Sequence, residues 1–98
     1  MVVPVELKRK YLSRRTQDLI QLKESLKQND YSFALKLGHQ VKGNAKTFEL
    51  QEMAPLGMEL ELAARRKDKE TLFFVVQKLE TAISVAQSVF HPAPERED

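Results

Sequence analysis

The chain has no cysteine, which excludes a disulfide framework and any thiolate chemistry. It lacks an apolar run near the roughly 18 residues that a membrane-spanning helix needs, and its N-terminus lacks the apolar core of a signal peptide. There is no internal repeat or low-complexity tract, and almost no strand-like alternation. We therefore expect a soluble, cytoplasmic, helical protein that makes no membrane contact.

The length and charge of the chain restrict its size class and the kinds of partner it can have. The 98 residues suit one domain with a modest core, since a chain of this size buries roughly 60–65 % of its unfolded surface. The formal net charge is only +2, but residues 1–50 hold ten Lys/Arg against five Asp/Glu, whereas residues 51–98 hold six against nine. A mildly basic first half suits an acidic protein partner as well as it suits phosphate.

Apolar residues recur at helical spacing along most of the chain. Leu12, Leu19 and Leu26 follow one another every seven residues, for example. The pattern predicts helices over residues 5–28, 31–50, 51–66 and 68–90. Asp30 and Asp68 precede the second and fourth segments as caps. The second–third boundary is the least defined, because Pro55 fits a helix only in its first turn.

Four amphipathic helices joined by short turns cannot bury their apolar stripes singly. The predicted fold class is therefore all-α, an antiparallel four-helix bundle. We expect a single domain over residues 1–98 with its core over about 5–90. Residues 91–98 contain two prolines and no apolar period, which predicts a frayed, flexible tail.

The second predicted helix carries His39 on its solvent face. At about 100° per residue, His39 lies roughly 200° from Leu37, which belongs to the core stripe. Lys42 lies one turn further along, as does Gly43, although glycine inside a helix costs roughly 1 kcal/mol relative to alanine. An exposed, neutral imidazole with an ammonium beside it is suited to act as a nucleophile toward phosphorus. The same face carries Leu35, Lys36 and Lys46.

The run His-Gln-Val-Lys-Gly-Asn-Ala at residues 39–45 resembles the signature of histidine phosphotransfer domains, His-x-[hydrophobic]-Lys-Gly-x-[small]. The resemblance extends over about residues 4–88. It includes the Asn-Asp-Tyr…Leu…Leu-Gly-His run at 29–39 and Leu-Gly-Met-Glu-Leu-Glu at 56–61. Many members have glycine ten positions after the histidine, where this chain has Glu49, and this departure leaves the turn after the second helix undefined.

The resemblance implies a phosphorelay intermediate with an all-helical fold. His39 would accept a phosphoryl group from an aspartyl phosphate on a receiver domain and pass it to another receiver. Lys42 would steady the charge on the phosphoryl oxygens, Gln40 would donate a hydrogen bond to them, and Gly43 would let the receiver approach. No metal or cofactor is expected on this chain; Mg²⁺ would belong to the receiver, because no group of carboxylates is expected around His39.

The partners implied are receiver domains of response regulators or of hybrid sensor kinases. The expected docking residues on the second helix are Gly43, Leu35, Lys36 and Lys46. Apolar or basic residues of the first helix, namely Tyr11, Arg14 and Arg15, would extend this surface.

Other interpretations fit less well. In histidine-kinase dimerisation domains the phosphorylated histidine resembles the pattern His-[Glu/Asp], but here Gln40 follows His39. The sequence contains neither a P-loop nor room for an ATP-binding domain. We therefore expect a phosphoryl carrier and not an enzyme. Hydrolytic chemistry is disfavoured because a lone exposed His39 lacks an orienting partner and His91, the other histidine, lies in the tail.

Two non-catalytic alternatives remain open. The basic runs 8–10 and 14–15 suggest a weakly basic nucleic-acid-binding helical module, although Glu6 and Asp18 share that helix and we expect no nucleic-acid partner. A helical adaptor or scaffold would keep the bundle without the chemistry.

Overall fold

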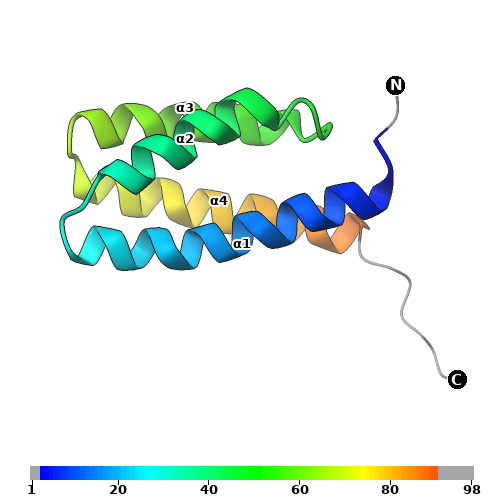
Figure 1. The fold of residues 1–98 in the computed structure, drawn as a ribbon, viewed down its shortest axis with the longest axis horizontal. Helices are drawn as coiled ribbons and strands as arrows, with labels where there is room; N and C mark the ends of the chain where they lie inside the picture. The colour runs from blue at the N-terminus through cyan, green and yellow to red at the C-terminus, as the bar shows by residue number, and fades with distance from the viewer. Residues whose placement is uncertain (1–2, 91–98) are drawn as a thin grey trace, which may run out of the picture.

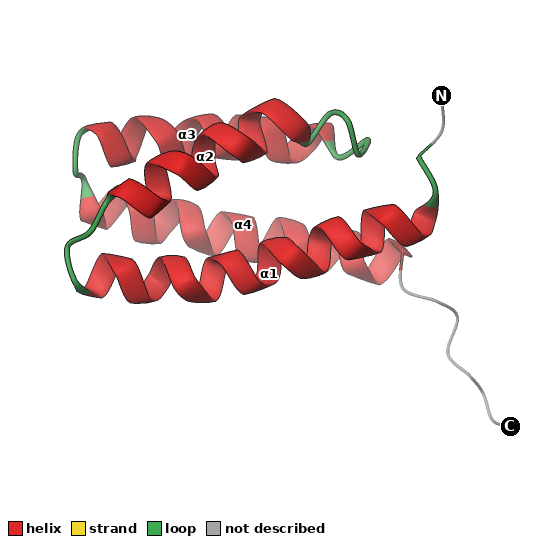
Figure 2. Ribbon diagram, viewed as in Figure 1, coloured by secondary structure: helices red, strands yellow, loops and turns green. Residues whose placement is uncertain are grey.

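A computed structural model describes residues 3–90 of the chain. In this part the chain forms four α-helices, α1 (Val5–Lys27), α2 (Ser32–Asn44), α3 (Ala54–Arg65) and α4 (Lys69–Phe90), with a short 3₁₀ turn, η1 (Gln51–Met53), before α3. Consecutive helices run in opposite directions, with α1 beside α4 and α2 beside α3 (Figure 1). Residues 3–90 contain no strand (Figure 2). The predicted fold class, an all-α antiparallel four-helix bundle, is confirmed.

Within residues 3–90, no helix combines the length and the apolar composition that crossing a membrane requires. The tail predicted over residues 91–98 lies outside the described residues.

Asp68 directly precedes α4 as predicted, whereas the N-cap residue of α2 is Tyr31 and Asp30 stands one residue before it. The Asp30 carboxylate accepts from the Ser32 backbone N–H at 3.1 Å and from its hydroxyl at 2.7 Å. Asp68 accepts in the same way from the Thr71 N–H at 3.2 Å and hydroxyl at 2.7 Å. These bonds satisfy N–H groups that have no partner inside the first turn of a helix.

The predicted end of the second helix was wrong. α2 stops at Asn44 rather than at residue 50, and α3 begins at Ala54, which puts Pro55 in its first turn. The chain reverses through Glu49, whose φ of 61° lies in the left-handed region that favours glycine. The Glu49 carboxylate forms an ion pair with Lys8 Nζ of α1 at 2.7 Å, which ties this turn to α1. A helix continued to residue 50 would lose both the turn and this contact.

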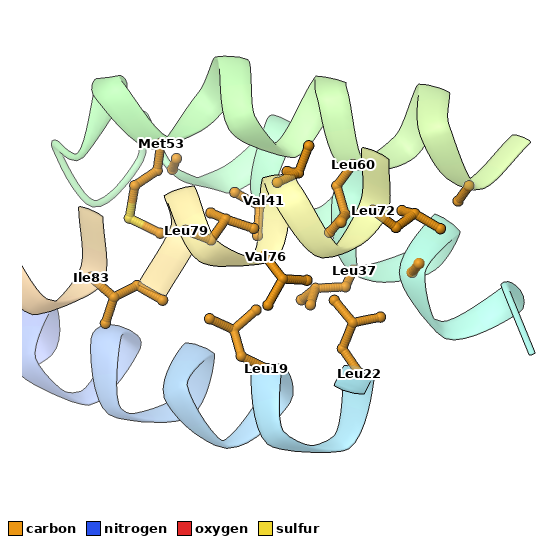
Figure 3. Packing of buried hydrophobic residues seen from close by; sticks show 14 of the residues in the cluster. Leu19, Leu22, Leu37, Val41, Met53, Leu60, Leu72, Val76, Leu79 and Ile83 are labelled. Atoms are coloured by element: carbon orange, nitrogen blue, oxygen red, sulfur yellow. The ribbon is translucent and has the colours of Figure 1, made fainter. Parts of the chain in front are cut away.

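The core is made of the predicted stripes from all four helices. Leu12, Leu19 and Leu26 of α1 are buried, as their seven-residue spacing predicts. Leu37 and Val41 of α2 meet Leu60 of α3 and Val76 and Leu79 of α4 in the same interior (Figure 3). Burial of α2 on this side leaves its opposite face, which carries His39, at the surface.

Candidate functional site

The helices α2 and α3 approach each other through two glycines, one on each helix. A Cβ atom added at Gly38 would lie 2.6 Å from the backbone nitrogen of Glu61, and one added at Gly57 would lie 2.5 Å from the backbone nitrogen of Lys42. Real Cβ atoms do not come so close to backbone atoms, so any side chain would force the helices apart. Backbone contact between these helices brings α3 to the edge of the His39 face.

His39 is exposed, as the helical projection predicts, with 71 % of its side chain accessible. Its Nδ1 atom lies 3.5 Å from Oε2 of Glu61 on α3. This distance is beyond ordinary hydrogen-bond length, so the contact is electrostatic. Glu61 is therefore a charged neighbour of His39 that comes from another helix, 22 residues later in the sequence, and not a hydrogen-bonded partner.

Glu61 is the centre of the charged cluster. Its side chain is buried, with only 7 % accessible, although it carries a carboxylate. Lys42 Nζ lies 2.9 Å from Oε1, and Arg65 Nη2 donates to Oε2, also at 2.9 Å. Two cations thus compensate the one buried charge before the imidazole is considered.

These contacts decide the ionisation of Glu61. The hydrogen bond from Lys42, followed by that from Arg65, lowers the pKa of the Glu61 carboxyl from 4.5 to about 2. Glu61 is therefore ionised at neutral pH. An anionic oxygen facing Nδ1 favours the tautomer that carries its proton on Nδ1, which leaves the lone pair on Nε2. The arrangement can present the lone pair of an exposed imidazole nitrogen as a nucleophile.

The other predicted residues of α2 surround His39 with different degrees of exposure. Gln40 and Gly43 are exposed, and a Cβ at Gly43 would meet nothing within 4 Å, so the space beside the imidazole is open. Lys36 and Lys46 are exposed and form no ion pair within residues 3–90. Leu35 is only half-exposed and packs against the core, which corrects its expected position on the open surface.

The predictions for α1 were partly wrong. Arg14 is exposed, but Tyr11 and Arg15 are buried. The Tyr11 hydroxyl donates to Oδ1 of Asn44 at 2.6 Å, and its ring stacks on Phe48 with the centroids 4.4 Å apart. At 100° per residue Tyr11 lies about 20° from buried Leu22, so the period of α1 itself places the tyrosine on the core side, where these contacts hold it.

Sequence reasoning missed Gly38, Gly57, Glu61 and Arg65. Glu61 and Gly57 stand inside the 56–61 run that carries the resemblance, but a helix projection cannot show which neighbour an α3 residue faces. Within the described part of the chain, no group of three or more His, Asp or Glu side chains is placed to hold a metal ion.

One of the comparisons with known proteins identifies a family. The family model for the Hpt domain matches residues 6–88, which is most of the chain and includes α2 and α3 entirely and all but the outermost residues of α1 and α4. Searches of curated proteins and of solved structures find no match. Domains of this family carry phosphoryl groups on a histidine and interact with the receiver domains of two-component systems. The chain belongs to the histidine phosphotransfer domain family and has the family's role as a phosphoryl carrier in phosphorelays.

Proposed function

We propose that His39 is the residue of this carrier that accepts a phosphoryl group from the aspartyl phosphate of one receiver domain and passes it to the aspartate of another. The observation that supports the assignment best is the exposed imidazole whose Nδ1 faces the buried, ionised carboxylate of Glu61. In this reaction Nε2 attacks phosphorus in line with the bond to the aspartyl oxygen. The N–P bond forms as the O–P bond breaks, and the aspartate leaves as a carboxylate.

Glu61 supports this step through charge. The imidazole keeps its Nδ1 proton during the attack, so the ring becomes cationic while the phosphoryl group is attached. Oε2 of Glu61, 3.5 Å from Nδ1, stabilises that positive charge. Return transfer to an aspartate makes the imidazole ring neutral again. The Glu61 carboxylate thus stabilises the ring charge in both directions of transfer, and no proton moves at Nδ1.

Lys42 is assigned to the phosphoryl oxygens. It is half-buried and its Nζ is held by Glu61 at 2.9 Å in the unphosphorylated protein. A phosphoryl group on Nε2 adds negative charge beside this ammonium, which then stabilises both the Glu61 carboxylate and the phosphoryl oxygens. Gln40, next to His39 and exposed, is assigned a hydrogen bond to a phosphoryl oxygen.

Receiver docking is assigned to the surface of α2 around His39. Gly43 leaves open space for the approaching domain, Lys36 and Lys46 supply positive charge, and the accessible part of Leu35 supplies apolar contact. We assign Mg²⁺ to the receiver and no cofactor or kinase activity to this chain, which works in the cytoplasm with receivers of response regulators or hybrid sensor kinases.

The test is a transfer assay. Purified protein is mixed with a panel of phosphorylated receiver domains and Mg²⁺, and phosphate is mapped by mass spectrometry and by its lability in acid. We expect acid-labile phosphate in the wild-type protein and none in His39→Gln, with the same circular dichroism for both. Equal labelling of both proteins, or no labelling of folded wild type by any receiver, would contradict the proposal.

A further inference from the structure

A groove of about 260 Å³ lies between the N-terminal half of α1 and the end of α2. Two of its lining residues are aromatic: the rings of Tyr11 and Phe48 stack with their centroids 4.4 Å apart. Asn44 lines the groove from α2 and follows His39 by five residues, which is about 140° around the helix. The groove therefore lies on a different side of α2 from His39.

Positive charge gathers at this groove. Lys10 and Arg14 line it from exposed positions on α1, and neither forms an ion pair within residues 3–90. Arg15, also in the lining, pairs with Asp18 at 2.9 Å, but its buried Nε has no hydrogen-bond partner in the described part of the chain. Stacked rings beside exposed cations suit a ligand that combines apolar groups with carboxylates.

The residues that follow α4 have this composition. Residues 91–98 read His-Pro-Ala-Pro-Glu-Arg-Glu-Asp, so that two prolines precede three carboxylates and one arginine. Proline-containing segments in general favour the extended polyproline II conformation, and such segments bind grooves lined by aromatic side chains. Along this segment the apolar groups come first and the acidic groups second.

The end of α4 lies within reach of the groove. Phe90 is the last residue that the structure describes, and Nζ of Lys8 on α1 lies 4.8 Å from the centroid of its ring. A chain in polyproline II geometry advances about 3.1 Å per residue, so residue 95 can lie about 15 Å from Phe90 and residue 98 about 25 Å. A helix with its side chains is only about 10–12 Å wide. The acidic residues can therefore reach the far side of α1.

The groups of the groove follow one another around α1 in the same order as those of the segment. Tyr11 lies about 60° around the helix from Lys8, which marks the end of α4. Arg14 and Lys10 follow in the same direction, at about 120° and about 160° from Lys8. A chain that leaves Phe90 in this direction meets the aromatic rings before it meets the exposed cations.

We propose that residues 91–98 bind in this groove of the same molecule. The two prolines pack against the stacked rings, and the carboxylates pair with Lys10 and Arg14. The bound segment neutralises the exposed cations on this side of α1 and so weakens the attraction of the bundle for other anions. The segment is thus a ligand of the bundle, in place of the frayed tail that its composition alone predicts. The assignment uses no group of the His39 face and stands apart from the phosphoryl chemistry.

The position of the segment is measured with a spin label. The chain has no cysteine, so Asp98→Cys gives one attachment point for a nitroxide in the full-length protein, with Glu95 and Glu97 left in place. Paramagnetic broadening of the backbone amides then reports where the segment lies. We expect the strongest broadening at residues 10–14 and at residue 48. Broadening centred on the end of α4 instead, as a frayed tail produces, would overturn the proposal.

Charge variants of the spin-labelled protein separate specific binding from proximity. Lys10→Gln, Arg14→Gln removes the groove cations. The control, Lys27→Gln, Arg66→Gln, removes two exposed cations at the ends of α1 and α3, which lie at the opposite end of the bundle from the start of α1 (Figure 1). At low salt we expect the groove variant to reduce the broadening at residue 48 by roughly threefold and the control to leave it unchanged. Equal broadening in both variants and their parent would overturn the ionic contacts and with them the site.

The apolar contact is tested without the spin label by Pro92→Ser, Pro94→Ser. We expect the ring proton shifts of Tyr11 and Phe48 to move, while those of Phe74, which is 57 % exposed on α4, stay unchanged. Unchanged shifts at Tyr11 and Phe48 would overturn the packing of the prolines on the stacked rings.

Binding within one molecule is distinguished from binding between molecules by mixing. Spin-labelled protein of natural isotope abundance is added to ¹⁵N-labelled protein that carries no spin label. We expect no broadening at residues 10–14 in the mixture, at the concentration at which protein with both labels shows it. Equal broadening in the two samples would place the segment in the groove of a second copy and overturn the intramolecular site.

Discussion

The carboxylate of Glu61 on α3 lies 3.5 Å from Nδ1 of His39 on α2, across a helix contact made possible by Gly38 and Gly57. An otherwise isolated surface histidine thus has a fixed anionic neighbour. Because Lys42 and Arg65 keep that neighbour ionised, its influence on the imidazole is constant over the neutral pH range.

Removal of the Glu61 charge should slow phosphoryl transfer without abolishing it. In Glu61→Gln the imidazole loses the anion that favours the Nδ1–H tautomer and that stabilises the cationic ring. We expect single-turnover transfer to fall by roughly tenfold, and the ¹⁵N shifts of His39 to move toward the other tautomer. Glu59→Gln, an exposed carboxylate on the same helix, is the control. Unchanged rate and unchanged shifts in Glu61→Gln would contradict the role given to the carboxylate.

Glu61 should also contribute to stability in acid. Its pKa is about 2 in the folded protein against an ordinary value of 4.5, so the unfolded chain takes up its proton first as the pH falls. The contribution is present in full above about pH 4.5 and is lost as the pH falls toward 2. We expect the difference in unfolding free energy between wild type and Glu61→Gln to be constant from pH 6 to 8 and to shift against wild type below pH 4.5, measured by urea titration. A difference independent of pH down to 2.5 would show that the pKa is not lowered.

The contact between α2 and α3 should not tolerate a methyl group. In Gly57→Ala the new Cβ would lie 2.5 Å from the Lys42 backbone, and the helices must separate. We expect a loss of about 1–3 kcal/mol in unfolding free energy, measured by chemical denaturation. Gly43→Ala, where the added Cβ meets nothing within 4 Å, should instead gain up to about 1 kcal/mol. Equal effects at the two glycines would contradict the close approach.

Gly43 offers a way to separate folding from partner access. Gly43→Leu should fold as well as wild type or better, since leucine is the stronger helix former and the space is open. The same side chain would occupy the approach to His39, and we expect slower transfer from a phosphorylated receiver. A wild-type transfer rate in this variant would show that the receiver does not use that space.

Lys42→Ala should affect rate more than folding. The lysine is half-buried and its Nζ contacts only Glu61 among ion-pair partners within residues 3–90. We expect transfer to slow by roughly tenfold, which corresponds to about 1.4 kcal/mol of transition-state stabilisation. The circular dichroism spectrum should be unchanged. Lys27→Ala, an exposed lysine at the end of α1, should retain the wild-type rate; an equal loss in both would indicate a nonspecific effect of charge.

The helical periods of the sequence predicted the fold class, the core stripes and the exposure of His39, because each of these depends on one helix at a time. The turn after α2 could not be predicted in this way. Its reversal depends on Glu49 adopting a positive φ, which the Lys8 ion pair from α1 accompanies. That contact joins residues 41 positions apart, and no local pattern reveals it.

The site was predicted from α2 alone. The residues that α3 adds were missed because contacts between helices leave no local sequence pattern. His39, Lys42 and Gly43 are close in sequence, whereas Glu61 and Arg65 meet them only because α2 and α3 touch at two glycines. Tyr11 was expected at the surface but is buried: it lies about 20° from Leu22 around α1 and pairs with Asn44 and Phe48. Contacts between helices therefore account for the additions from α3, whereas the burial of Tyr11 also follows from the helical period of α1.

The most direct test of the account is to find which nitrogen of His39 carries the phosphoryl group. The protein is phosphorylated by a receiver domain with ¹⁵N-labelled histidine and examined by ¹⁵N and ³¹P NMR, with His39→Gln as the blank. The account predicts phosphate on Nε2 and a proton on Nδ1 beside Glu61. Phosphate on Nδ1, or signals that persist in His39→Gln, would contradict it.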